Sequence, residues 1–404
     1  MTRRTPLLRA LSLLAALLLI GTTLSGHGDV RTGKATDRVI EFPDTAEHQT
    51  LVVDLHTHTV FSDGHVWPNI RMAEAILDGL DAIAVTEHAE YQPHLADIPH
   101  PDRNRSYEES VASLPEGSEL IVIAGSEITR VGPVGHMNAV FIEDANKLLR
   151  VSDPPEPFNA GEYYRKAGQW PAQEAVDEAR EQGAFVFWNH SWSIFRDNKT
   201  VMTDFHRQNA ANGKLHGIEV ANGRTYSEES FQLALDFDLA LIGVSDVHNL
   251  IDWDYKPHEG GHRPVNLVFA EAKTSAAIRE ALFAKRTVVW WKNLLLGRER
   301  DLAPLLEASM TVESARYSRT SRVLEVELLN HSDAKFLLRN ESRYTMTSDH
   351  DVIELAPHNE ITLRVRTGDQ LEAVALEFEV LNALTAPERP ALLTFELAPT
   401  VEDA

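Results

Sequence analysis

The chain has 404 residues and carries 38 Lys and Arg against 61 Asp and Glu, which gives a formal net charge of −23. Its hydrophobic share of 43% is ordinary for a globular protein and excludes a chain that is disordered throughout. The absence of cysteine excludes disulfides, thiolate-bound zinc and a thiol nucleophile. The acidic balance argues against nucleic acid or an anionic membrane as the main partner, because both require clustered Lys and Arg.

Residues 1–26 have the pattern of an export signal. Arg3, Arg4 and Arg9 precede or begin an apolar run over residues 10–20, which small residues follow. This run is shorter than the roughly 20 residues of a membrane span. We therefore predict a Sec or twin-arginine signal peptide and a periplasmic or secreted protein with no stable membrane anchor after cleavage. An uncleaved anchor is the alternative.

The next segments are a leader or linker over residues 27–50 and an α/β domain over residues 51–298. In the α/β domain short apolar runs alternate with helical patterns, which is typical of a parallel sheet covered by helices. About seven such units favour a (β/α) barrel over an open sheet. Strands are expected at 51–55, 82–85, 120–124, 137–142, 184–188, 217–220 and 239–244, with 265–269 and 287–291 closing the domain.

The remaining residues, 299–404, have a different pattern. Apolar and polar residues alternate in 322–329, 360–366 and 373–380, and turn residues separate these runs. Such alternation over about 100 residues predicts a small all-β sandwich. We expect this domain to be non-catalytic, because it holds few of the histidines.

Histidines and carboxylates recur directly after the expected strands of the first domain. If the strands are parallel, their C-terminal ends meet around one mouth, where barrels of this kind place their sites. Nine side chains would then converge: His56, His58, Asp63, His88, Glu127, His136, His190, Asp246 and His248. The other histidines, including His65, His94, His100 and His206, are expected on loops or the surface.

This mixture of imidazole and carboxylate indicates metal binding. Such ligands suit zinc, manganese or iron, and three crowded carboxylates need cations to offset their repulsion. Residues two apart in an extended chain point to the same side, so His56 and His58 can chelate one ion, as can Asp246 and His248. Nine ligands suit two or three divalent ions. The alternative is a set of buried histidines with structural hydrogen bonds.

Several segments resemble the PHP (polymerase and histidinol phosphatase) family. These are 54–64, 79–88, 125–127 and 245–248, together with His190, in the family's order. The resemblance covers residues 51–291. It implies a distorted (β/α)7 barrel with a di- or trinuclear metal site that hydrolyses phosphoesters. One departure is Glu87, where the family usually has aspartate. The export signal and the β-rich tail resemble the exported, phosphodiesterase-like branch.

The resemblance also implies a distribution of ligands. One ion would take His56, His58, Glu127 and Asp246. A second would take Glu127, His136 and His190, and a third Asp63, His88 and His248. Glu127 and Asp246 are thus both ligands and catalytic residues, and the expected nucleophile is a hydroxide bridging two ions.

Four further residues are candidates for contacts with substrate. Arg130 could clamp a phosphate oxygen, and Asn222, at the end of a strand, could supply a polar contact. His258 or His262, beside a glycine-bearing loop, could protonate the leaving group. A surface salt bridge and plain loop positions are the alternatives for these residues.

The function that we predict is that of an exported metal-dependent phosphoesterase. The expected partner is a small-molecule phosphate ester, most consistent with a diester. The alternatives are a phosphomonoesterase of the histidinol-phosphatase type and a catalytically idle metal-binding or interaction protein on the same scaffold. The sequence leaves the oligomeric state open.

Overall fold

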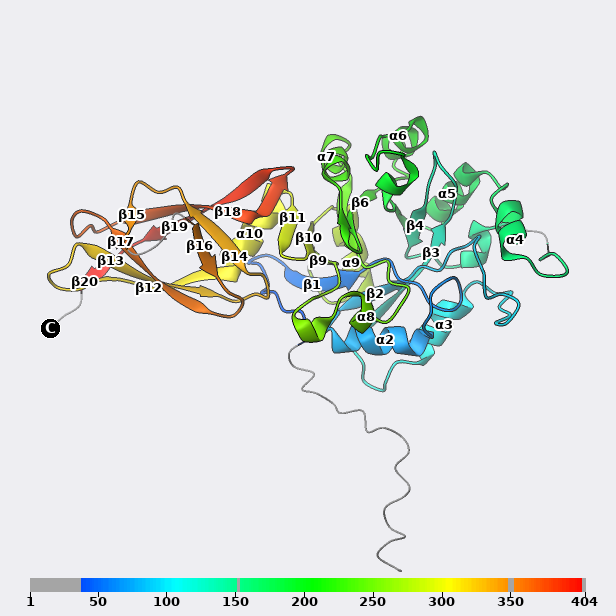
Figure 1. Ribbon diagram of the computed structural model, residues 1–404, viewed down its shortest axis with the longest axis horizontal. Coiled ribbons are helices and arrows are strands. Elements are labelled where there is room, and N and C mark those ends of the chain that lie inside the picture. The colour runs from blue at the N-terminus through cyan, green and yellow to red at the C-terminus, as the bar shows by residue number, and fades with distance from the viewer. Residues whose placement is uncertain (1–37, 151–152, 348–351, 402–404) are drawn as a thin grey trace, which may run out of the picture. The chain divides into compact units, whose positions relative to one another are not determined.

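The computed structural model describes residues 38–150, 153–347 and 352–401 (Figure 1). The predicted signal peptide, residues 1–26, lies outside the described residues, as do residues 27–37 of the predicted leader. Within the described part of the chain, none of the helices has the length and apolar character needed to cross a membrane.

Within residues 38–347 seven strands form the wall of a barrel. They are β1 (Gln49–Asp54), β2 (Ala82–Val85), β3 (Ile121–Ile128), β4 (Met137–Val140), β5 (Phe185–Trp188), β6 (Gly217–Asn222) and β8 (Ala240–Val244). Neighbours β1–β2, β2–β3, β5–β6 and β6–β8 are parallel. The ring closes where the chain beyond β8 meets the chain beyond β1: Asp246 N–H donates to His56 O at 2.9 Å, and His58 N–H to Val247 O at 3.2 Å. The predicted distorted α/β barrel is confirmed.

One strand runs against the expected direction. β4 is antiparallel to both β3 and β5, whereas the sequence pattern predicted parallel strands throughout. A short strand can reverse in this way because the link from β3 to β4 is a loop of a few residues, too short for a crossover helix. The reversal brings the N-terminal end of β4 to the rim that holds the C-terminal ends of the other six strands.

Helices cover the outside of the barrel (Figure 1). They are α2 (Pro68–Leu77), α3 (Arg105–Ala112), α4 (Ala160–Ala167), α5 (Ala172–Glu181), α6 (Asp204–Ala211), α7 (Glu228–Asp236), α8 (Ile251–Asp254) and α9 (Ser275–Phe283). Several begin with a side-chain cap: Ser227 accepts from Ser230 N–H, and Thr274 from Ala277 N–H. Since helices cover the outer face and side chains fill the inside, strands such as β2 and β5 are buried along their whole length.

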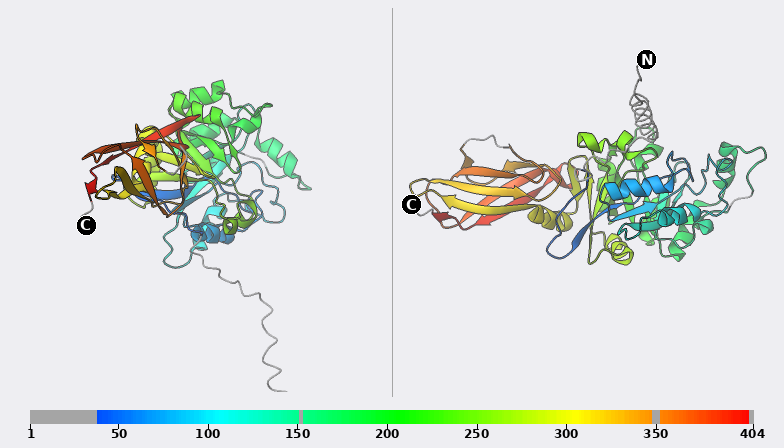
Figure 2. Two further views of the ribbon diagram at one scale, coloured as in Figure 1. Left: turned by 60° about the vertical axis from the view of Figure 1, so that its left-hand side comes forward. Right: turned by 90° about the horizontal axis from the view of Figure 1, so that it is seen from below.

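An antiparallel extension leads from the barrel to the C-terminal domain. β9 (Val265–Ala270), β10 (Thr287–Trp291) and β11 (Leu294–Gly297) follow β1 in the sheet, each antiparallel to its neighbour. β11 then pairs in parallel with β18 (Val374–Ala386), so one sheet continues from the barrel into the next domain (Figure 2). The side chain of Asn266 fastens β9 to β8 through Gly243 N–H and C=O, at 3.0 and 2.8 Å.

The C-terminal domain is the predicted β-sandwich. After α10 (Glu299–Ser309) come β12 (Met310–Tyr317), β13 (Val323–Asn330), β14 (Phe336–Asn340), β15 (Thr345–Met346), β16 (Val352–Leu355), β17 (Glu360–Arg366), β18, β19 (Arg389–Leu397) and β20 (Thr400–Val401). One sheet has the order β15-β17-β13-β12-β20; the facing strands are β16, β14, β18 and β19. Burial alternates along β13, as expected for a sheet with one face on a core.

Candidate metal centre

All nine predicted ligand residues lie at one rim of the barrel. His56, His58 and Asp63 follow β1, His88 follows β2, Glu127 lies near the end of β3, and His190 follows β5. Asp246 and His248 follow β8. His136 directly precedes β4, and it joins the others because that strand is reversed. The convergence expected from the sequence is therefore present in the structure.

The first group of side chains surrounds Asp63. Its Oδ1 atom lies 3.1 Å from His248 Nε2 and 3.4 Å from His88 Nε2. His58 Nδ1 is 3.9 Å from the same oxygen. Ligand atoms of these four residues all fall within 4.8 Å of one another, which is close enough to surround a single ion.

Glu127 is the centre of the second group. Its carboxylate is completely buried and lies 2.6 Å from His88 Nδ1, 3.0 Å from His136 Nδ1 and 3.5 Å from His190 Nε2. Its two oxygens also face His56 and His58, each at 3.6 Å. A carboxylate with imidazoles on both sides can bridge two ions.

The third group joins His56, His58 and Asp246. The two imidazole Nε2 atoms face each other at 3.0 Å, and Asp246 Oδ1 is 3.2 Å from each. Both rings are buried completely. Two nitrogens and one oxygen converging on one point form three adjacent corners of a coordination site.

Three carboxylate oxygens in these groups support metal binding more directly. Asp63 Oδ1, Glu127 Oε2 and Asp246 Oδ1 are shielded from water, yet none accepts a well-formed hydrogen bond from the described residues. A buried anionic oxygen in this state is costly unless a cation compensates it. Because all three point into the ring of histidines, the donor set fits divalent metal ions.

The ionisable side chains of the cluster shift one another's pKa values. Burial disfavours charge on His88, but Glu127 and Asp63 outweigh it and raise the pKa of His88 to about 10. Burial and the neighbouring imidazoles His248 and His88 lower the pKa of His58 to about 4. Although burial opposes it, the surrounding imidazoles hold the pKa of Glu127 well below its usual range. Because metal ions bind imidazole and carboxylate in their deprotonated forms, metal binding at this cluster would release protons.

Side chains behind the ligands fix the orientation of the rings. Glu219, buried on β6, contacts His56 Nδ1 at 2.8 Å, and it also accepts from His190 N–H and Asn222 Nδ2. Asn189 Nδ2 donates to Glu127 Oε1 at 2.8 Å. Sequence reasoning did not assign Glu219 a role, although a glutamate inside an otherwise apolar buried strand is the signal that could have found it.

The backbone at the rim adopts unusual conformations. His190 has φ of 25° and Asp246 has φ of 48°, in the region that non-glycine residues rarely occupy. Hydrogen bonds hold both, from His190 N–H to Glu219 and from Asp246 N–H to His56 O. At Gly64 a Cβ atom would lie 2.7 Å from Thr59 N, so only glycine lets the loop carrying Asp63 fold back this tightly.

Glu87, which departs from the family pattern, holds a loop of the rim in place through hydrogen bonds. Its carboxylate accepts hydrogen bonds from Thr59 N–H at 3.1 Å and from Ser106 Oγ at 2.7 Å, and it also contacts Ser62 Oγ. It therefore ties the loop of His58 and Asp63 to α3. The longer side chain serves to hold this loop and does not point at the ions' expected position.

The four residues that were candidates for contacts with substrate lie in different surroundings in the structure. Asn222 lies at the cluster, where it donates to Asp246 Oδ2 at 3.0 Å. Arg130 forms a buried ion pair with Glu90 and donates to Thr129 O and Trp170 O at 3.0 and 3.1 Å. Its guanidinium is thus committed to the protein, and its phosphate contact stays a prediction.

The two histidines that were candidates for proton donors also lie in different surroundings. His258 is exposed in the turn η4 (Pro257–Glu259), 3.7 Å from Glu259. His262 is stacked on Trp290 with ring centres 3.4 Å apart, and its nitrogens contact Arg263 O and Lys292 O. The structure does not bring His262 to the metal cluster, so of the two only His258 has a ring that is largely exposed to solvent.

His100 lies on a loop as expected, whereas the expectation for His206 is wrong because it lies on the helix α6. Both are buried, His100 against Gln92 and His206 stacked on Trp188 with ring centres 3.6 Å apart. Burial lowers the pKa of His206 to about 3, so its ring packs as a neutral aromatic group.

Comparisons with known proteins agree with this architecture. A crystal structure from Bacteroides vulgatus, of a two-domain protein containing a predicted PHP-like metal-dependent phosphoesterase, is 37% identical. The match covers 89% of this chain and 98% of that chain, with a TM-score of 0.78. Residues 310–396 match the family model DUF5001, an Ig-like domain. No curated protein sequence matches the chain.

Two other solved structures are more distant. PsfC from Pseudomonas syringae is 18% identical over 60% of this chain and 92% of that chain, with a TM-score of 0.38. An amidohydrolase from Chromobacterium violaceum with bound sulfate is 17% identical over 49% and 87%, with a TM-score of 0.32.

Proposed function

Because the chain belongs to the two-domain PHP-like metal-dependent phosphoesterases, we propose that it hydrolyses small organic phosphate diesters with the help of two or three divalent ions at the barrel rim. The observation that carries the proposal is the set of three buried carboxylate oxygens that accept no hydrogen bond within the described residues. They face the histidines of the rim, and carboxylate and imidazole together are ligands suited to catalytic divalent ions.

The proposed ligands divide as follows. His56, His58 and Asp246 hold one ion together with Glu127; His136 and His190 hold a second, which shares Glu127; and Asp63, His88 and His248 hold a third. The close approach of His248 Nε2 and His88 Nε2 to Asp63 Oδ1 supports the last group. Manganese, zinc and iron all suit these donors. When bound, such ions supply the positive charge that acidifies water and offsets the charge of a phosphate.

The remaining groups of the chain orient this centre and its substrate. Glu219, Asn189 and Asn222 hold the ligand side chains in place. A protein with a net charge of −23 repels an anionic ester in general, so the substrate must be attracted locally at the rim. His258, exposed in the loop after β8, is the group that we propose as donor of a proton to the leaving alkoxide.

The proposal includes export. Arg3, Arg4 and Arg9 with the apolar run of residues 10–20 support a periplasmic or secreted location, where a small diester can be a source of phosphate. A mature chain lacking residues 1–26, recovered from the periplasm or the medium after expression in a Gram-negative host, would support this part. Recovery of the full-length chain from the cytoplasm or the membrane would contradict it.

The test of activity compares ester classes. Purified protein loaded with manganese or zinc is expected to hydrolyse bis(4-nitrophenyl) phosphate faster than 4-nitrophenyl phosphate. His56→Ala and Asp246→Ala each remove a proposed ligand and should abolish turnover, whereas His331→Ala, an exposed histidine of the sandwich, should not. Faster cleavage of the monoester would favour a phosphomonoesterase. Equal rates in wild type and both ligand variants would end the proposal of an enzyme.

A further inference from the structure

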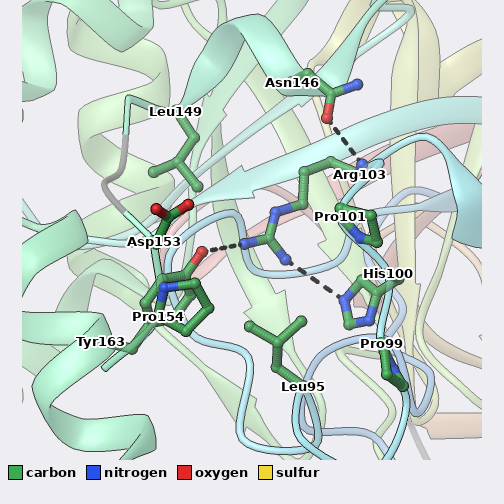
Figure 3. Close-up of a pocket in the computed structure, with 10 residues that line it drawn as sticks. All are labelled: Leu95, Pro99, His100, Pro101, Arg103, Asn146, Leu149, Asp153, Pro154 and Tyr163. Carbon is green, nitrogen blue, oxygen red and sulfur yellow. Dashed lines mark hydrogen bonds between the residues drawn. The ribbon is translucent and has the colours of Figure 1, made fainter. Parts of the chain in front are cut away.

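A pocket lies against the loop that follows β2 and that also carries His88. Its volume is about 420 Å³, within the range of small-molecule sites. The loop between β2 and α3 forms one wall, and the chain leading into α4 forms the other (Figure 3). Most of its lining is apolar and comes from Leu95, Pro99, Pro101, Leu149 and Pro154.

The polar feature of this pocket is Arg103. Figure 3 shows its guanidinium in the middle of the lining, between Tyr163 and His100. Its Nη2 donates to Tyr163 Oη at 2.8 Å, and Nη1 lies 3.4 Å from His100 Nε2. Neither of these described partners is a carboxylate, although most arginines in the described chain have an acid beside them.

Among the residues that the structure describes, no acid therefore compensates the charge of Arg103. Burial lowers the pKa of Arg103, but a guanidinium stays protonated at neutral pH. His100 cannot help, because burial and the nearby Arg103 lower its own pKa and keep its ring neutral. Its Nδ1 lies 2.6 Å from Ile98 O and its Nε2 contacts Gln92 Oε1, so His100 offers the guanidinium no negative charge. A partly buried cation whose described neighbours are neutral favours an anionic ligand.

The one acid of the lining limits the charge of that ligand. Asp153 is exposed at the edge of the pocket and forms no ion pair with the guanidinium within the described residues. A second negative charge on a ligand would be repelled by this carboxylate. The pocket thus suits one negative charge next to Arg103 and an apolar body against the leucine and proline side chains.

The pocket is connected to the metal centre through one residue. Gln92 contacts His100 on one side, and its amide donates to the carbonyl of His88 on the other. His88 is one of the proposed ligands. A molecule that contacts Arg103 would therefore lie behind the ligand shell without touching the ions.

We propose that this pocket is a separate binding site for a small organic carboxylate with an apolar body, held by the guanidinium of Arg103. This site does not depend on the proposed catalytic function, since neither the cavity nor Arg103 needs a bound metal ion. It would add to the protein a specificity for an organic acid that the phosphoesterase reaction does not require.

The probe for this site is 4-bromobenzoate. Soaked into crystals of the metal-loaded protein, it is expected to give an anomalous bromine peak between Leu95 and Leu149. In calorimetric titration Arg103→Gln should bind the probe at least about tenfold more weakly than wild type. Arg165→Gln, which removes the same charge from an exposed position on α4, should bind it as wild type does.

The outcomes separate this proposal from the catalytic one. A bromine peak only at the metal centre, or no peak, would overturn the proposal whether or not the variants fold. So would equal affinity of wild type and Arg103→Gln. If 4-bromophenyl phosphate, a dianion, occupied the pocket as tightly as the carboxylate, the assignment to a carboxylate would be wrong. None of these results bears on ester hydrolysis, which is measured independently at the rim.

Discussion

At the rim of the barrel the side chains withdrawn from water are ionisable, whereas in the sandwich they are apolar. Glu127 and Phe378 are both fully buried, yet only the phenylalanine is satisfied by its protein neighbours alone, because Glu127 Oε2 accepts no hydrogen bond from the described residues. Burial of apolar surface stabilises a fold directly, while burial of a carboxylate without a partner destabilises it. The apolar burial of the sandwich therefore stabilises the fold directly, whereas the buried carboxylates of the rim require a cation that the chain does not supply.

The largest expected effect is on the free energy of unfolding, and it tests whether apolar burial in the sandwich stabilises the fold. Phe378→Ala removes a fully buried ring on β18 and should lower the free energy of unfolding by about 3–5 kcal/mol, measured by denaturant titration. Leu392→Ala on the neighbouring strand, with 69% of the residue exposed, should change it by less than about 0.5 kcal/mol. Because the change is remote from the rim, the metal content of the folded Phe378→Ala protein should stay the same. A loss of metal would show that the two regions are not independent.

The next largest effect is on the metal affinity of the rim. It is tested at Glu219, which is not one of the proposed metal ligands. Glu219→Gln removes the negative charge behind His56 and His190, and should weaken metal affinity by about 10–100-fold while the fold persists. Glu377→Gln, an exposed glutamate of β18, is the matched control. Metal titration with a competing chelator measures both. Should Glu219→Gln bind metal as wild type does, the account of how His56 is oriented would be wrong.

The effect that is smallest per pH unit concerns a histidine that belongs to neither region. The pKa of His206 is about 3 in the folded protein because of burial, against about 6.5 in an unfolded chain. Below pH 6.5 the unfolded state binds the extra proton, so His206 makes stability fall by about 1.4 kcal/mol per pH unit as the pH is lowered toward 3.

The variant His206→Phe keeps a ring against Trp188 and removes this titration. Its free energy of unfolding should therefore depend less steeply on pH between 6.5 and 4 than that of wild type. His331→Phe, at an exposed histidine of the sandwich, should leave the slope unchanged. Equal slopes in wild type and His206→Phe would mean that the folded and unfolded states protonate this ring over the same pH range, which would contradict the lowered pKa.

Much of this organisation could be predicted from the sequence. Strands buried on both faces appear as continuous apolar runs, and a polar residue just beyond such a run must lie at a strand end, which is why His88 and Asp246 were placed correctly. The alternation of β13 likewise reveals its single buried face. These features depend on local periodicity alone.

The remaining features depend on contacts between distant segments. The direction of β4 is set by the short loop before it and by pairing with β3 and β5, which periodicity does not record. The burial of His206 depends on Trp188, and the lack of an acidic partner for Arg103 in the described part of the chain depends on which side chains surround it. The role of Glu219 is visible only once β6 is seen to stand behind His56.

The central claim is that Asp63, Glu127 and Asp246 are partners of divalent cations. The most direct measurement is elemental analysis of the purified protein beside Asp246→Ala, combined with anomalous diffraction at the metal edges. The account predicts two or three divalent ions per wild-type chain, located among these three carboxylates, and fewer in the variant. Wild-type protein that holds no more metal than the variant after incubation with manganese, zinc and iron would contradict it.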